Sequence, residues 1–129
     1  RYLGVDILSG PNVDLLMGSE EWNKLGFIDT VVSGQTIEHV ADIPALMKEI
    51  YRILKPEGTL VIIAPSQGDA HDYPIWVGNF PEPRMREVVT AGGFEIVEMT
   101  TSPVEPWKLV TCVARKPYPL RKYREYENQ

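Results

Sequence analysis

The residues of this chain that are best suited to chemistry follow predicted strands. His39 and His71 are the only two histidines, and each comes shortly after an apolar segment that reads as a strand. His39 follows Glu38 in GQTIEHV, and His71 lies in SQGDAHDYP. An imidazole or a carboxylate beside a substrate can remove a proton, and both groups are ligands for divalent cations. These residues are therefore candidates for acid–base catalysis or metal binding.

The same residues also have a purely structural interpretation. His39 can cap or pack at the start of a helix, and His71 can be a solvated loop residue. Gln35 shares a face with Glu38 or His39 if the segment forms a turn of helix. The loop around His71 also holds three aromatic side chains that either cover a planar substrate or pin the loop down: Tyr73, Trp76 and Phe80.

Alternating strands and helices position these loops. Residues 28–33 read as a strand rich in β-branched side chains, and residues 59–65 read as an apolar strand covered by helices on both faces. Between them, apolar residues at spacings of three and four predict an amphipathic helix over 43–54, with Asp42 as its N-cap. A second helix is predicted at about 82–91.

The remaining segments are predicted strands. Residues 94–99 and 108–116 form a final pair, and residues 2–7 read as a buried strand that ends on the acid Asp6. The order of the elements predicts an α/β fold with a mostly parallel sheet. Because ligands bind at the carboxyl ends of strands in such sheets, the loops that follow the strands are the candidate site.

Composition limits the classes of protein to consider. The 129 residues form one domain, residues 1–116, followed by a basic tail, residues 117–129, that we expect to be solvated. The net charge of −5 argues against a nucleic-acid partner, and no apolar run reaches the ~20 residues of a membrane span. The single Cys112 lies in an apolar strand, where an inert thiol in a reducing compartment is expected. We therefore expect a cytoplasmic protein with no membrane partner.

Three segments together carry a family resemblance. The succession YLGVDI, IDTVVSGQTIEHV and LMKEIYRILKPEGTLVIIAPS resembles the class I S-adenosylmethionine-dependent methyltransferases of type 11. In that family one strand ends in an acid, a later strand is followed by EHV, and a helix closes with RxLKPGG. The resemblance covers residues 2–116. It implies a Rossmann-like sheet with S-adenosylmethionine across the carboxyl ends of its first half.

The resemblance also implies roles for individual residues. Asp6 would bind the ribose hydroxyls of the cofactor, and Ile7 would lie against the adenine. Gly18 and Ser19 occupy the place where the family often has an acid near the adenine amine. Gln35 would approach the methionine part or the methyl group.

Some members of the family bind a divalent metal through ExxEH. This chain has QTIEH, so Glu38 and His39 match the motif and Gln35 replaces the first glutamate. A neutral amide is a weaker ligand than a carboxylate for a hard cation. Glu38, His39 and His71 are the candidate metal ligands, and the same three are candidates for removing a proton from the methyl acceptor.

The resemblance further implies elements that this chain lacks. In the family, a central strand and a glycine-rich loop precede the part that corresponds to residue 2. Three alternatives follow: the chain is a fragment of a longer protein, a homo-oligomer supplies the missing edge, or the Asp6 strand pairs directly with residues 28–33. The expected function is methyl transfer to an unidentified acceptor, a small molecule or another compound. The alternative is a non-catalytic remnant that acts as an interaction or assembly module.

Overall fold

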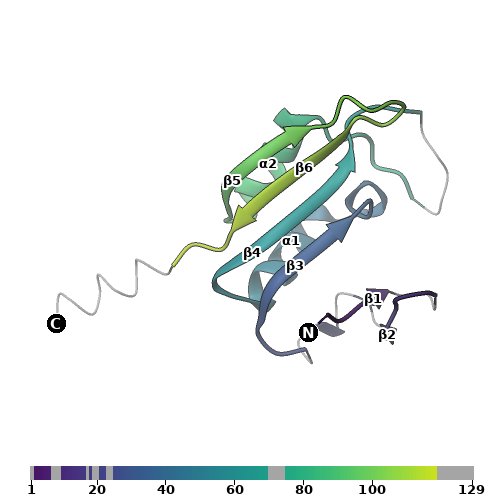
Figure 1. Ribbon diagram of the computed structural model, residues 1–129. Coiled ribbons are helices and arrows are strands. Elements are labelled where there is room, and N and C mark those ends of the chain that lie inside the picture. The colour runs from purple at the N-terminus through teal and green to yellow at the C-terminus, as the bar shows by residue number, and fades with distance from the viewer. Residues whose placement is uncertain are drawn as a thin grey trace, which may run out of the picture.

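The computed structural model describes residues 2–6, 10–16, 18, 21–22, 25–69 and 75–118. Within them, a four-stranded sheet carries two α-helices on one face, and two short strands pair apart from it (Figure 1). The main elements are β3 Ile28–Gly34, α1 Ile43–Ile53, β4 Leu54–Pro65, α2 Glu82–Ala91, β5 Glu95–Thr101 and β6 Leu109–Arg115. The predicted α/β class is confirmed.

The strand order of the sheet is β3-β4-β6-β5. β3 and β4 are parallel, whereas β6 runs antiparallel to both of its neighbours, β4 and β5. The predicted final strand pair and both predicted helices are confirmed. The sheet is therefore parallel where the strand–helix–strand unit lies and antiparallel where β5 and β6 complete it.

The first helix, α1, is held at both of its ends. Asp42 is the N-cap, as predicted, and its Oδ1 accepts a hydrogen bond of 3.0 Å from the Ala45 N–H. At the other end, the Lys116 Nζ donates to the carbonyls of Tyr51 and Leu54, at 2.8 and 2.9 Å. These bonds satisfy carbonyls that a helix end leaves without partners. Burial lowers the pKa of Lys116.

The two faces of the sheet differ in their cover. Both helices pack on one face and lie behind the sheet in Figure 1. On that face the strands bury alternate side chains: Leu60, Ile62, Ala64, Val110, Cys112 and Ala114. The intervening residues Val61, Ile63 and Val113 are only half-buried. The prediction that β4 is covered by helices on both faces is therefore wrong for the described residues, because no described helix reaches the second face.

The two short strands lie outside the main sheet. β1 spans Val5–Asp6, β2 spans Leu15–Leu16, and the two are parallel. Gly4 is tied to Asp14, because its N–H donates to the Asp14 Oδ2 and its carbonyl accepts from the Asp14 N–H, both at 2.7 Å. In the described part of residues 2–22 this strand pair is accompanied only by a turn at 11–12 and a short 3-10 turn at 21–22.

One expectation about the N-terminal segment is wrong, and one of the three alternatives left open for it is excluded. Residues 2–7 were expected to form a buried strand, but Tyr2 is 76% exposed and the strand has only two residues. The Asp6 strand also does not pair with residues 28–33, because β1 and β3 belong to separate sheets. The apolar residues that suggested burial face a cleft instead of a neighbouring strand. No helix in the described ranges has the length and hydropathy needed to cross a membrane.

Candidate functional site

The carboxyl ends of β3 and β4 lie side by side. Gly34 pairs with Ile63 at the end of the parallel ladder, and the next N–H, that of Gln35, donates to the Ile63 carbonyl at 2.7 Å. Gln35 is exposed and has a φ of 48°, so the chain turns sharply there into a 3-10 turn, η2, at Ile37–His39. The predicted site segment after β3 is therefore at a strand end, as expected.

The turn η2 separates Glu38 from its neighbours. The Glu38 side chain is 1% exposed, and its Oε1 has no hydrogen-bond partner among the described residues. Gln35, by contrast, is exposed, and His39 is half-buried. The three side chains thus occupy different environments and do not share a face, because the left-handed residue Gln35 precedes the turn instead of belonging to a helix.

The backbone and ring contacts of η2 tie it to the segment 75–77. The Nδ1 of His39 donates to the Ile75 carbonyl at 2.6 Å, and the Val77 N–H donates to the Glu38 carbonyl at 2.8 Å. A neutral imidazole that carries its proton on Nδ1 has its basic lone pair on Nε2. The structural interpretation of His39 as a packing residue is therefore supported, and the ring is also held in one tautomer.

The structure gives no support to the metal hypothesis. No group of three histidine, cysteine or acidic side chains is placed to hold a metal ion among the residues that the structure describes. Glu38 points into the protein while Gln35 points to solvent. His71 lies outside the described residues. We therefore derive no function from a metal.

The residues assigned to the cofactor are only partly described. Asp6 is the last residue of β1, at the strand end where the prediction put it, and Gly18 is half-buried. Ile7 and Ser19 lie outside the described residues. A cleft of about 1000 Å3 separates this region from β3, and both Val5 and Gly34 line it. β1, through Val5, and the end of β3 therefore border the same space, whereas Asp6 is not among the residues that line it.

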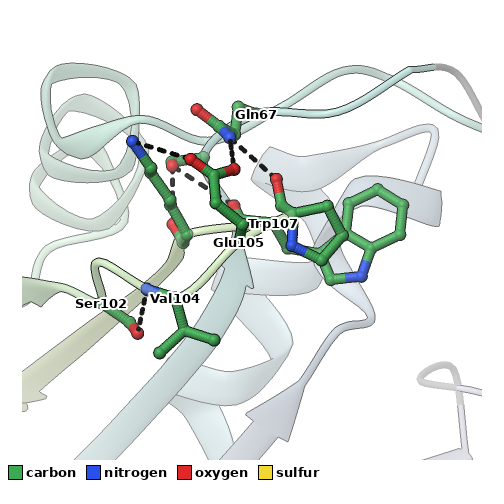
Figure 2. Close-up of polar contacts among 8 residues, drawn as sticks. Gln67, Ser102, Val104, Glu105 and Trp107 are labelled. Carbon is green, nitrogen blue, oxygen red and sulfur yellow. Dashed lines mark hydrogen bonds and ion pairs between the residues drawn. The ribbon is translucent and has the colours of Figure 1, made fainter.

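A second set of residues at the strand ends was not singled out by the sequence. The loop between β5 and β6 folds back over the end of β4, as Figure 2 shows. The Gln67 Nε2 donates to the Glu105 Oε2 at 2.7 Å and to the Pro106 carbonyl at 2.8 Å. The Ser66 N–H donates to the Trp107 carbonyl at 3.1 Å. We call residues 66–69 and 102–108 together the β4-end clamp.

Gly68 shows how closely the two parts of the β4-end clamp pack. Its φ is 124°, and a Cβ at this position would lie 2.5 Å from the Trp107 ring. The Asn79 Nδ2 donates to the Gly68 carbonyl at 2.9 Å, which links the clamp to the segment before α2. The glycine in SQGDA was the only signal in the sequence for this close contact. Nothing in that stretch predicts that the partner is a tryptophan almost 40 residues further on.

The aromatic residues before α2 serve to anchor their segment. Phe80 is fully buried, its N–H donates to the Pro65 carbonyl at 2.8 Å, and the Arg84 guanidinium lies 4.1 Å from its ring centre. For Phe80 the pinning interpretation is therefore correct. Trp76 is half-buried, and Tyr73 lies outside the described residues.

Two other features carry none of the predicted site residues. A smaller cavity of about 510 Å3 lies between α1 and α2 and is lined by apolar residues such as Met47 and Val88. Cys112 is buried in β6, and burial raises the pKa of its thiol. A thiol that is protonated and covered is not a nucleophile.

Comparison with known proteins gives a family match in the first half of the chain. Residues 20–62 match the family model described as a methyltransferase domain, a stretch that contains β3, η2, α1 and most of β4. No curated protein sequence matches the chain significantly.

Solved structures share the fold at low sequence identity. A 1,6-didemethyltoxoflavin-N1-methyltransferase from Burkholderia thailandensis, solved with 1,6-didemethyltoxoflavin and S-adenosylhomocysteine, is 18% identical with a TM-score of 0.75. The match covers 88% of this chain and 60% of that one. A methyltransferase from Methanosarcina mazei is 17% identical with a TM-score of 0.68, and the match covers 90% of this chain and 82% of that one.

A third structure was also solved with a cofactor product. The N-methyltransferase NodS from Bradyrhizobium japonicum, in complex with S-adenosylhomocysteine, is 12% identical with a TM-score of 0.65, and the match covers 88% of this chain and 65% of that one. The chain thus spans between about half and two thirds of several of these structures. Residues 20–62 are thus similar to a methyltransferase domain, and the chain shares its fold with S-adenosylmethionine-dependent methyltransferases of known structure.

Proposed function

We propose that this chain is the core of an S-adenosylmethionine-dependent methyltransferase that acts on a small-molecule acceptor. The observation that carries the proposal is the shared cleft: Val5 of β1 and Gly34 at the end of β3 border one space of about 1000 Å3, and β3 lies in the segment that matches the methyltransferase domain. Ligand sites of α/β sheets lie at such strand ends. A single buried cysteine suits a reducing compartment, so we place the enzyme in the cytoplasm.

The cleft offers part of a cofactor site. At Gly34 the position of a missing Cβ has no atom within 4 Å, so the strand end is open to a ligand. In the proposal Asp6 binds the ribose hydroxyls, Ile7 lies against the adenine, and Gln35 faces the methionine part. Gly18 and Ser19 would lie near the adenine amine. When bound, S-adenosylmethionine supplies an electrophilic methyl group on a sulfonium.

In the proposal, residues that follow β3 and β4 remove the proton from the methyl acceptor. His39 takes this role, because the Ile75 carbonyl accepts from its Nδ1 and holds the ring in place at the end of β3. Glu38 is too deeply buried to meet an acceptor directly, so its role is to position the turn through its carbonyl and Val77. His71 remains a candidate from the neighbouring strand end.

Calorimetric titration with S-adenosylhomocysteine tests the proposal. Asp6→Ala should weaken binding about tenfold or more, the loss expected for hydrogen bonds to a charged group. Glu95→Ala is the matched control, because Glu95 is an exposed carboxylate on β5 that does not line the cleft and pairs with Arg115 at 2.7 Å. Equal affinity for all three proteins would contradict the assignment of Asp6.

The alternative function is that of a non-catalytic interaction or assembly module. It is favoured by the lining of the cleft, to which Val5, Phe27 and Val32 contribute apolar side chains and in which Asp29 is the one charged residue among the described residues. A folded chain that does not bind S-adenosylhomocysteine and forms a stable oligomer would favour this alternative. Methylation of any acceptor by the chain would exclude it.

A further inference from the structure

A groove between α1 and α2 opens on the helical side of the molecule. Its volume is about 510 Å3, and Lys48 and Glu87 are the only charged residues among the described residues that line it. The rest of the lining is apolar or aromatic; Met47 is buried there, whereas Ala91 is exposed. A concave apolar surface of this volume is typical of a binding site. The groove contains none of the residues assigned to methyl transfer.

The chain leaves the sheet beside the Tyr51 end of this groove. The backbone of Lys116 is fixed near the start of β4, since its N–H donates to the Gly58 carbonyl and its own carbonyl accepts from the Glu57 N–H, at 2.9 and 2.7 Å. Its Nζ lies 4.5 Å from the centre of the Tyr51 ring, and Tyr51 lines the groove. Figure 1 shows β6 ending on the side of the sheet where β4 begins. The residues that follow Lys116 therefore start next to the groove.

The sequence after this point has the pattern of a segment that binds an apolar groove. Residues 119–129 lie outside the described residues and read PLRKYREYENQ. Three large side chains recur there at a spacing of three, which places them on one face of a helix: Leu120, Tyr123 and Tyr126. The charge of this part of the chain is also opposite to that of the rest. Residues 115–129 hold 5 basic and 2 acidic residues, whereas residues 1–114 hold 8 basic and 16 acidic ones.

We propose that residues 120–126 of this chain dock in the groove between α1 and α2, with Leu120, Tyr123 and Tyr126 against its apolar lining. The basic residues between them then lie near the exposed Glu87. An amphipathic segment that docks through apolar residues a helical turn apart is a recurring mode of recognition. The proposal takes the place of the expectation that the tail is solvated, and it holds whether or not the chain binds the cofactor.

Length and attachment favour the chain's own tail as the occupant. From Tyr51 to Ile43 the groove follows α1 for about 12 Å, and a helical segment of seven residues is about 10 Å long. Residues 117–119 span up to about 10 Å when extended, which is enough to connect Lys116 to the groove. A segment joined to the protein beside its binding site has an effective concentration in the millimolar range. The tail of a second copy has no such advantage in dilute solution.

A spin label on the tail of the full chain tests the proposal by nuclear magnetic resonance. Cys112 is buried, so Asn128→Cys supplies the one reactive thiol of the chain. The label should broaden the amide signals of Lys48 and Val88, which line the groove, and spare those of Val104 and Lys108, near the opposite end of β6. Equal broadening at both places, or none at the groove, overturns the proposal.

Dilution identifies which tail is bound. The spin-labelled, isotope-enriched chain is mixed with an excess of chain that carries neither label. Broadening that persists at Val88 comes from the chain's own tail and supports the proposal. Broadening that disappears comes from the tail of a second copy and overturns it.

Two substitutions at neighbouring exposed positions of α2 locate the docking site. Ala91→Lys places a positive charge in the groove lining and should abolish the broadening at Val88, whereas Thr90→Lys, outside the lining, should retain it. Leu120→Ser combined with Tyr123→Ser leaves the groove intact and should abolish the broadening too, so the test does not depend on the fold of the Ala91 variant. Broadening that survives the two tail substitutions overturns the proposal.

Discussion

The two edges of the sheet are built differently. At the β5 edge, Val97 is 65% exposed but lies between Glu95 and Glu98, at an irregularity of the strand pairing. At the β3 edge, Val32 is equally exposed, yet it faces a cleft shared with Phe27 and other apolar residues. Charges and bulges protect a strand edge against pairing with another strand. The comparison teaches that the β5 edge carries features that oppose pairing with another strand, whereas the β3 edge exposes apolar side chains to a shared cleft.

The largest expected effect is a loss of stability when the β4-end clamp is disturbed. Gly68→Ala should destabilise the protein by about 1–3 kcal/mol, because the new Cβ must occupy a left-handed backbone position and displace the Trp107 ring. Urea unfolding measures the loss, and the Ser66 amide, which donates to the Trp107 carbonyl, should exchange faster.

The control for this change lies at the end of the open strand. Gly34→Ala meets no atom within 4 Å, so its free energy of unfolding should change by no more than about 0.5 kcal/mol. Equal losses of unfolding free energy for Gly68→Ala and Gly34→Ala would show that the chain packs no more closely around Gly68 than around Gly34.

A lysine scan compares the two edges directly. Val32→Lys should sharply reduce binding of an apolar fluorescent dye, because it places a charge inside the exposed apolar cluster. Val97→Lys should leave dye binding unchanged, since Val97 already lies among charges. Both variants should keep the free energy of unfolding within about 0.5 kcal/mol. A similar fall in dye binding for both would remove the distinction between the edges.

The smallest effect is expected at the ion pair of the β5 edge. The Arg115 guanidinium donates to the Glu95 carboxylate at 2.7 Å, and this hydrogen bond raises the pKa of Arg115 further. Both side chains are about half exposed, so water and salt screen the pair. Glu95→Gln should lower the urea midpoint only slightly at low salt and not at all at high salt. A decrease in the urea midpoint that persists at high salt would show that this ion pair contributes more to stability than a solvent-screened pair does.

The strand–helix–strand unit could be predicted from the sequence because its signals are local. The apolar spacing over 43–54, the Asp42 cap and the β-branched run before Gly34 each act within a few residues. Parallel strands joined by one helix bring their carboxyl ends together, so the adjacency of the β3 and β4 ends also followed.

The environments of the site residues could not be predicted in the same way. Glu38 and His39 are adjacent in sequence, yet one is buried without a partner for its Oε1 among the described residues and the other is held by Ile75. The sequence spacing assumed a helical turn that includes Gln35, whereas Gln35 has a positive φ and precedes η2. One left-handed residue was enough to redirect the side chains that follow.

The sequence by itself determined the class of fold, the helices and the strand ends on which candidate residues lie, because hydrophobic periodicity and capping act over a few residues. Only the tertiary structure decided that β1 lies apart from β3, that the loop with Trp107 closes over Gly68, and that Val32 faces an apolar cleft. The physical reason is the same in each case. The spacing of apolar residues predicts which side chains are buried. Which segment buries them depends on packing between parts of the chain that are far apart in sequence.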